Sequence, residues 1–352
     1  MPDANDLCRR DDSAPRHPAM TVAPGWRDGA SQSVNDRALY VELVRHATLA
    51  PSSHNTQCWR FQFSDRSITI LPDYTRRCPV VDPDDHHVFV SLGCAAENLT
   101  QAALAHGLRA EAGFDDATDA LRIKLSPTAA TRSPLFDAIA LRQCTRADYD
   151  GRPLDPRELR LLEAAGNDAG VGLVMLTDRP TMERVLEFAI EGNAVQLRDP
   201  AFVRELTSWI RFNARDAARH GDGLYSACTG NPSIPSWLGR LALPWLITPR
   251  SENRRLIGQV RSSAGLAVFV GASASKDSWI AVGRAYERFA LQATALGIRH
   301  AHLNQPVELA SLRPKFAEAL GMGGRRPDLV LRFGHGPTLA RSPRRPVEAV
   351  LT

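Results

Sequence analysis

Long hydrophobic runs, paired cysteines and blocks of like charge are all missing from this sequence of 352 residues. The longest apolar run, at residues 264–272, is far shorter than the ~20 residues of a membrane span. The six cysteines form no C-x-x-C pair, which argues against structural zinc and a disulfide framework and suits a reducing cytoplasm. The net charge is only +4, and the sequence contains no block of five like charges, so no nucleic-acid arm is indicated. We therefore expect a soluble, cytoplasmic protein without membrane or nucleic-acid partners.

Several catalytic motifs are absent as well. No G-x-G-x-x-G follows a predicted strand, which argues against a resident dinucleotide on a Rossmann unit. His54 stands beside serines, but there is no G-x-S-x-G elbow, and neighbours in sequence rarely achieve the geometry of a hydrolase triad. The segment DPDDHH at residues 82–87 offers metal-ligand types. Because of Pro83 and the contiguous spacing we interpret it as a loop, and we predict no metal site.

Residues 1–36 are rich in Asp, Arg, Ser and Pro. They contain no apolar stretch of the kind that a signal peptide needs. We predict a disordered N-terminal extension. Met20 is an alternative to Met1 as the start of translation, and the sequence does not decide between them.

Hydrophobic spacing predicts a mixture of helices and strands. A first helix would be capped by Asn35 or Asp36 and end at Pro51. Alternating apolar residues predict a strand pair joined by the turn SDR, and a further strand beyond it. A second helix would stop at Gly107, a usual C-terminal cap residue. The ranges predicted after the first helix are two paired strands at 59–63 and 68–71, the second helix at 90–106, and the further strand at 121–125.

Two long segments of the chain are similar to each other. SLGCAAENLTQAALAHGL (91–108) and AVGRAYERFALQATALGI (281–298) match in their bracketing glycines, in several alanines and in one glutamate. Alanine-rich helices are common, so chance similarity is the alternative, but the glycines and the glutamate favour duplication. Residues 156–178 likewise repeat the helix, junction and strand of residues 39–63.

The repeats predict two related halves after the N-terminal extension, residues 37–130 and residues 131–352. The second half carries an insertion at about residues 194–262 that has no counterpart in the first. This insertion includes HGDGLYSACTGNPSIPSW, a Gly- and Pro-rich stretch that is long enough to form a lid.

The segment APSSHNTQCW at residues 50–59 concentrates hydrogen-bonding side chains at a helix-to-strand junction. It resembles the hallmark of the nitroreductase family of flavin enzymes, A-P-S-S-x-N-x-Q-P-W, with Cys58 in place of proline. RQCTR at residues 142–146 is similar to the family's basic R-x-[ST]-x-[KR] segment, and SPRRP at residues 342–346 to its basic C-terminal stretch. The resemblance covers residues 38–352 apart from the insertion. It is closest to the Acg-like branch of long single chains.

The resemblance implies an α+β nitroreductase-like fold in which one chain forms an intramolecular pseudo-dimer. The polar junction occurs only in the first half and the basic segment only before the second, so one complete FMN site is expected between them. A monomer then suffices for function. The implied activity is an NAD(P)H-dependent reduction, in ping-pong order, of a nitro, quinone or similar small substrate.

The resemblance also implies which residues bind FMN. Guanidinium groups match a phosphate that carries about two negative charges, and Arg142, Arg344 and Arg345 would supply them. Arg146 would approach the ribityl chain or the flavin ring. The other candidates are the junction residues Pro51, Ser52, Ser53, His54, Asn55 and Gln57, then Cys144 at the hydroxyl position of the basic segment, and the loop Leu303, Asn304 and Gln305 beside the flavin edge. His54 is also a candidate proton donor near neutral pH, with a packing role as the alternative.

Each of these elements has a less specific interpretation. The junction is compatible with plain turn chemistry, and paired arginines are often solvated surface groups. The activity has an alternative too. If residues 222–225 of the insertion cover the flavin ring, the protein would sequester FMN as a stress protein and show little reductase activity.

Overall fold

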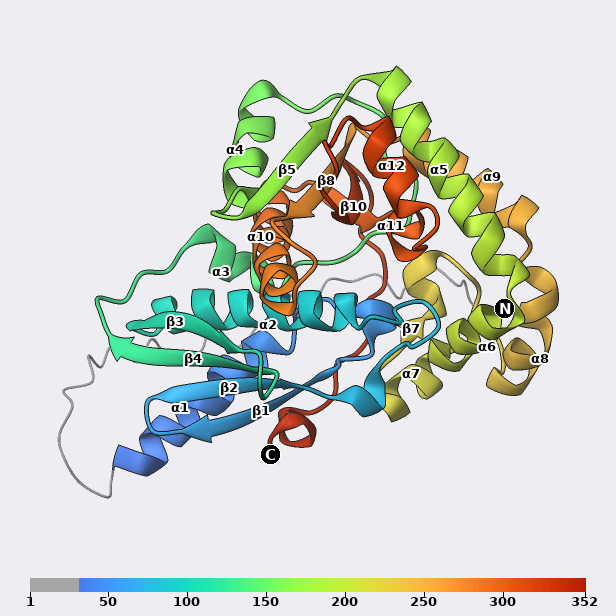
Figure 1. The fold of residues 1–352 in the computed structure, drawn as a ribbon. Coiled ribbons are helices and arrows are strands. Elements are labelled where there is room, and N and C mark those ends of the chain that lie inside the picture. The colour runs from blue at the N-terminus through green and yellow to red at the C-terminus, as the bar shows by residue number, and fades with distance from the viewer. Residues whose placement is uncertain (1–31) are drawn as a thin grey trace, which may run out of the picture.

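The computed structural model describes residues 32–352 (Figure 1). Two four-stranded antiparallel sheets and a two-stranded ribbon are combined with helices, which confirms the predicted α+β class. Residues 1–31 of the predicted N-terminal extension lie outside the described part. Its last residues belong to helix α1 (Gln32–Ala47), which begins before both predicted caps.

The first sheet contains the predicted hairpin. Ser64 pairs with Ser67 across a two-residue turn, and Trp59 and Phe61 point into the core while the residues between them are exposed. The predicted strand at residues 121–125 is also present, and it pairs with a strand that the sequence analysis missed. In sheet order the strands are β1 (Trp59–Ser64), β2 (Ser67–Pro72), β4 (Ala120–Pro127) and β3 (Leu108–Asp115).

The second sheet repeats this arrangement. Its order, β5-β8-β10-β9, matches the order β1-β2-β4-β3 of the first sheet. In both sheets a long helix follows the second strand along the chain and precedes the third. The strands are β5 (Val171–Leu176), β8 (Gly265–Gly271), β10 (Pro327–Gly334) and β9 (Arg299–His302). The short elements around the two sheets are η1 (Ser53–Asn55), η2 (Tyr74–Arg76), α3 (Pro134–Ile139), α4 (Pro156–Gly166), α11 (Gln305–Glu308), α12 (Arg313–Ala319) and η4 (Val347–Val350).

The two similar segments form helices α2 (His86–Ala105) and α10 (Lys276–Ala295), which cross at glycines. A Cβ on Gly93 would collide with the backbone of Ile280, and one on Gly283 would collide with the backbone of Val90. These contacts are reciprocal, because each glycine meets the residue three positions before the other glycine. Reciprocal contacts are typical of an interface between two equivalent units.

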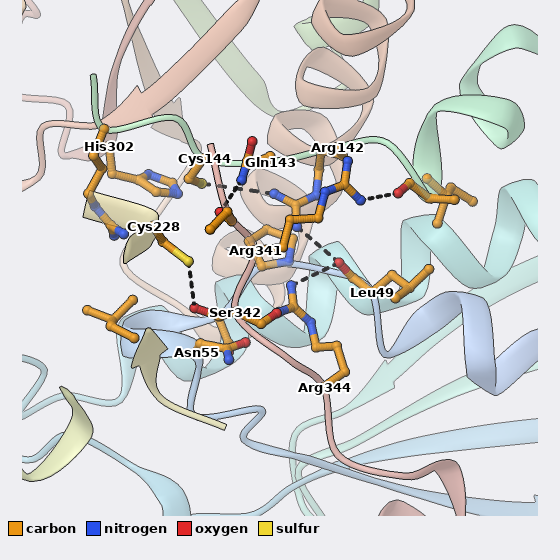
Figure 2. Close-up of a pocket in the computed structure, with 17 residues that line it drawn as sticks. Leu49, Asn55, Arg142, Gln143, Cys144, Cys228, His302, Arg341, Ser342 and Arg344 are labelled. Atoms are coloured by element: carbon orange, nitrogen blue, oxygen red, sulfur yellow. Dashed lines mark hydrogen bonds between the residues drawn. The ribbon is translucent and has the colours of Figure 1, made fainter. Parts of the chain in front are cut away.

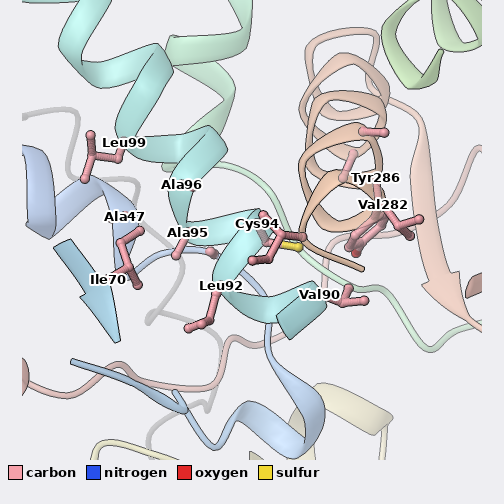
Figure 3. Packing of buried hydrophobic residues seen from close by; sticks show 14 of the residues in the cluster. Ala47, Ile70, Val90, Leu92, Cys94, Ala95, Ala96, Leu99, Val282 and Tyr286 are labelled. Atoms are coloured by element: carbon pink, nitrogen blue, oxygen red, sulfur yellow. The ribbon is translucent and has the colours of Figure 1, made fainter. Parts of the chain in front are cut away.

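Helix α2 is packed on two sides by other elements (Figure 3). Its side chains contact α1 and β2 on one side and Val282 and Tyr286 of α10 on the other, within one hydrophobic cluster that joins both halves. The helix is long and apolar enough to cross a membrane, but 78% of it is buried inside the protein. That burial is expected of the core helix of a globular protein.

The predicted insertion, at about residues 194–262, is largely helical. It lies within the segment between β5 and β8, which stands where the first sheet has a two-residue turn. Only the stretch around residues 221–235 is largely irregular. The elements between β5 and β8 are α5 (Arg179–Arg198), α6 (Pro200–Trp209), β6 (Ile210–Arg211), α7 (Ala214–His220), β7 (Leu224–Tyr225), η3 (Ser226–Thr229), α8 (Ser236–Leu246) and α9 (Pro249–Arg261).

After β10 the chain returns to the first half. Leu351 forms a parallel bridge with Phe61 of β1, and the amide of Thr352 donates to the carbonyl of Phe61. This C-terminal arm carries Arg341, Arg344 and their neighbours past the polar junction.

Candidate functional site

The polar junction has a tight and unusual backbone. His54, Asn55 and Gln57 have φ values of 49°, 56° and 55°, a left-handed region in which non-glycine residues cost about 1 kcal/mol or more each. The amide of Gln57 donates to Oγ of Ser52 over 2.9 Å and closes the turn. Strain of this kind persists only where surrounding contacts hold it, and it is common at functional sites.

Those contacts come from distant parts of the chain. Nδ2 of Asn55 donates to the carbonyls of Gly223 (2.9 Å) and Pro343 (3.0 Å). Nε2 of Gln57 donates to the carbonyl of Gly221 (2.8 Å), and its Oε1 accepts from the amide of Arg345 (2.8 Å). The junction thus joins the insertion and the C-terminal arm. The side chain of Gln57 is fully buried and its amide is used by the protein itself, so it is not free for a cofactor.

A buried ion-pair cluster strengthens the same attachment. Oδ1 of Asp222 accepts from Nε (3.1 Å) and Nη2 (2.6 Å) of Arg211, and its other oxygen pairs with Arg76. Nε of Arg76 donates to the carbonyl of Thr56 in the junction over 2.6 Å. Asp222 is 7% exposed, so this carboxylate connects the insertion to the junction in a region largely shielded from water.

A cavity of about 140 Å³ lies between the end of α1, the basic segment and the C-terminal arm (Figure 2). Among the residues that the structure describes, four arginines and no carboxylate line its walls, an arrangement that favours an anionic ligand. Of the residues predicted from sequence, Pro51, Ser52 and Asn55 line it together with Arg142, Cys144, Arg146 and Arg344. Arg341 is the fourth arginine, and the sequence analysis missed it.

Two of the arginines donate to carbonyls at the end of α1. Nη2 of Arg142 donates to the carbonyl of Leu49 (3.0 Å), and its Nε lies 3.3 Å from Oε1 of Glu287. Arg344 donates to the carbonyls of Thr48, Leu49 and Ala50 at the end of α1. Burial, together with the charge of Arg142, lowers the pKa of Arg344 to about 10. An anion in the cavity would relieve this repulsion.

Arg345 is placed differently from the prediction. It does not line the arginine cavity, and its Nη2 donates to the carbonyl of Ala349 over 2.6 Å. Its contribution to the site is the backbone amide that holds Gln57. The hydrogen bond to Ala349 in η4 holds the guanidinium of Arg345 outside the cavity.

Two further cavities adjoin the first. They have volumes of about 440 and 120 Å³, and all three share the side chains of Arg146 and His302. Asn304 lines both of the added cavities and Gln305 the larger one. Leu303 is buried, and its amide donates to the carbonyl of Val330 (2.8 Å), so this amide is not available to a flavin.

His54 does not have the properties of a proton donor at neutral pH. Burial lowers its pKa to about 4, with smaller contributions from Arg146 and His87. Its Nδ1 lies 3.5 Å from Sγ of Cys78. The His54 ring lines both added cavities, but it is neutral near pH 7. Ser53 lines the smaller of the two.

Cys144 lies among groups that activate a thiol. Its Sγ is 3.9 Å from the hydroxyl of Tyr286 and 3.9 Å from Nη1 of Arg142. Burial raises the pKa of this thiol, but hydrogen bonding and charge from His300 and His302 outweigh it and hold the pKa well below its ordinary value. The sequence analysis did not identify either histidine as part of the site.

A similar cluster of an arginine, a buried glutamate and a helix end lies around Arg288. There Arg288 of α10 donates to Oε2 of Glu97 (3.0 Å) and to the carbonyl of Ala165 at the end of α4 (3.3 Å). It also pairs with Asp168 at 2.5 Å. Arg142 makes the equivalent contacts with Glu287 and the end of α1, but it faces the cavity, whereas Arg288 is neutralised by two carboxylates.

Comparison with known proteins agrees with this geometry. No family model matches the chain. Two curated proteins, from Mycobacterium tuberculosis strains CDC 1551 and H37Rv, are 27% identical over 348 residues, which cover 94% of this chain and 97% of each relative. Both bear the provisional name NAD(P)H nitroreductase. Their names support the nitroreductase family.

Solved structures give only weak similarity. A nitroreductase of Bacteroides fragilis with bound FMN is 14% identical, covers 60% of this chain and 95% of its own, and has a TM-score of 0.39. The FMN-dependent nitroreductase of Mycobacterium smegmatis in complex with NADPH is also 14% identical, covers 61% of this chain and 96% of its own, and has a TM-score of 0.41. The full-length sequence relatives, and not these structures, support the nitroreductase family.

Proposed function

We propose that this protein is an FMN-dependent NAD(P)H oxidoreductase of the nitroreductase type. The observation that carries the proposal is the cavity that four arginines line without any carboxylate. A flavin phosphate is the kind of anion that such a cavity suits. The names of the full-length relatives support the same activity.

The residues present fit FMN. Arg142, Arg341 and Arg344 would hold the phosphate, with Ser52 as a short hydrogen-bond donor beside it. Arg146 lines all three cavities and would place its charge beside the ribityl chain or the ring. Bound FMN would supply hydride transfer from NAD(P)H to a second substrate.

We propose a single site per chain, within an intramolecular pseudo-dimer of the Acg-like kind. The reciprocal contacts of Gly93 and Gly283 and the matching strand orders support the pseudo-dimer. Arg288, neutralised by Glu97 and Asp168, supports the loss of a second site. A monomer would then be the functional unit. The five described cysteines are free, as expected for a protein of the cytoplasm.

The insertion supports a reductase rather than a sequestering protein. A lid pressed onto the flavin would leave no room for a substrate. Instead, the insertion encloses the cavity of about 440 Å³, whose walls include Phe202, Leu206, Phe212 and Leu243. Apolar walls with a few polar groups suit a small aromatic molecule, so a nitroaromatic or quinone substrate in ping-pong exchange is our proposal.

Titration and reduction of the purified protein test this function. FMN fluorescence should quench with a stoichiometry of one per chain. NADPH should then bleach the visible absorbance of the bound flavin under anaerobic conditions. Bleaching by dithionite but not by NADH or NADPH would instead favour sequestration. Failure to bind FMN would overturn the proposal altogether.

A further inference from the structure

Helix α8 of the insertion exposes an unusual amount of apolar surface. Of the nine large hydrophobic side chains that are exposed in the described part of the chain, four belong to this helix of eleven residues. Trp245 is 81% exposed, Trp237 70% and Leu241 65%. Figure 1 shows α8 at the outer edge of the molecule, away from both four-stranded sheets. Single exposed apolar residues need no explanation, but a cluster on one helix is typical of an interaction surface.

These exposed side chains form one face of α8. Trp237, Leu241 and Trp245 follow one another at intervals of four residues, which places them in a single stripe along a helix. Leu238 extends the stripe on one side, and the exposed side chain of Arg240 borders it on the other. The face is therefore apolar at its centre and basic at its edge.

The opposite face of α8 is held by the rest of the insertion. Gly239 and Leu243 line the cavity of about 440 Å³. A Cβ on Gly239 would collide with the ring of Phe212, so the helix approaches this ring closely. Nδ2 of Asn213 donates to Oγ of Ser236, the first residue of the helix, over 3.0 Å. Because these contacts use the inner face, the apolar stripe is fixed toward the solvent.

The charged surface around α8 has one sign. In residues 200–255 every exposed charged side chain is an arginine. Of the carboxylates in the same range, Glu205 accepts from the amides of residues 80 and 81, and Asp216 pairs with His220. Asp222 is buried in its ion-pair cluster, and Glu252 lines the cavity of about 440 Å³. The exposed arginines are Arg204, Arg215, Arg219, Arg240, Arg250 and Arg254.

An anionic lipid surface matches this combination of apolar and basic groups. Helices that lie in the interface of a membrane carry Trp and Leu on one face and basic residues beside it. A second copy of the chain is a poorer match, because a symmetric contact would bring two arginine-rich surfaces together. Residues 1–31 are also a poorer match, because they carry both aspartates and arginines and only scattered large apolar residues.

We propose that α8 docks the protein on an anionic membrane surface, with Trp237, Leu241 and Trp245 inserted among the lipids. The exposed arginines of residues 200–255 would face the headgroups. The sequence analysis expected no membrane partner because no apolar run is long enough to span a bilayer, but a helix that lies in the interface does not need that length. The proposal is independent of the reductase function.

Binding of the full-length protein to lipid vesicles tests this docking. The protein should sediment with vesicles of POPC and POPG in equal amounts, and much less with vesicles of POPC alone. At about 0.5 M NaCl, where exposed charges are largely screened, binding should fall. Brominated phosphatidylcholine in place of POPC should quench the tryptophan fluorescence, because quenching requires contact between an indole ring and the acyl chains.

Substitutions on α8 separate insertion from attraction by charge. Trp237→Ser combined with Trp245→Ser should lower the affinity for the mixed vesicles on the order of 10²-fold and remove the quenching. Arg240→Glu should lower this affinity on the order of 10-fold. Leu241→Ser should weaken binding, whereas the matched control Leu161→Ser removes an exposed leucine of α4 and should not. The melting temperature should stay unchanged in all of these variants, because the substituted side chains are exposed.

Three outcomes would overturn the proposal. The first is that the unaltered protein fails to bind the mixed vesicles at low salt. The second is a dimer in analytical ultracentrifugation that Trp245→Ser dissociates, since α8 would then bind a second copy of the chain. The third is vesicle binding that occurs only after residues 1–31 are deleted, because the N-terminal segment would then cover the helix. Should the double tryptophan variant not fold, unchanged binding of both Leu241→Ser and Arg240→Glu would overturn it as well.

Discussion

Replacing Asp222 by asparagine should detach the insertion from the polar junction. The substitution keeps the shape of the side chain and removes the negative charge that neutralises Arg76 and Arg211. Loss of one partner from a buried ion pair costs about 3–5 kcal/mol. Arg76 retains 18% exposure and still donates to the carbonyl of Thr56, so we expect about 3 kcal/mol, the lower end of that range.

Hydrogen exchange measures this change locally. The amide of Gly223 donates to the carbonyl of Asn55 and exchanges only when the insertion opens. A cost of about 3 kcal/mol corresponds to an increase in opening on the order of 10²-fold. Amides of the central strand β8 should exchange as before. Glu183→Gln removes an ion pair between α5 and α9 whose side chains are largely exposed, and it should change little. Unchanged exchange of Gly223 in Asp222→Asn would refute the role given to this carboxylate.

Three further predictions concern binding, reactivity and stability. Arg344→Ala should weaken FMN binding by about 1.5–3 kcal/mol, the scale of a charge-assisted hydrogen bond. In the same fluorescence titration Arg345→Ala should weaken binding much less. Equal losses in the two variants would place the phosphate elsewhere. Cys144 should react with iodoacetamide at a lower pH than ordinary thiols do, because its pKa is held low. FMN should protect it from this reaction, and peptide mass spectrometry measures both effects. Gly283→Ala should lower the free energy of unfolding by about 1–3 kcal/mol through overpacking, while Gly113→Ala, where a Cβ would meet nothing within 4 Å, should not; similar melting curves would contradict the close helix crossing.

Local patterns were sufficient to predict the hairpin and one further strand of the first sheet, together with the two central helices. The alternation from Trp59 to Ile70 and the two-residue turn predicted the hairpin, and the spacing of Gly93 and Gly283 predicted two equivalent helices. The helices of the insertion were missed although they carry local signals. Asp199 and Thr248 each cap a helix whose first residue is proline, a combination that marks helix starts.

The roles within the site depended on contacts that a sequence pattern does not contain. The hydrogen-bond partners of Asn55 and Gln57 lie 164 to 288 residues away in the chain. The motif placed both side chains at the site but did not reveal that they bind backbone groups of the insertion and the arm.

The attachment of the insertion and the proposed flavin site depend on the same residues. The left-handed backbone at His54, Asn55 and Gln57 is strained, and the bonds to residues 221–223 and to the arm are what hold it. The same arm carries Arg341 and Arg344 into the cavity. A ligand that binds these arginines therefore stabilises the arm and, through Gln57, the docked insertion. By linkage the insertion must in turn strengthen the binding of that ligand by the same free energy. The cavity that the insertion encloses, which we propose for the second substrate, would then be held more firmly when the cofactor is in place.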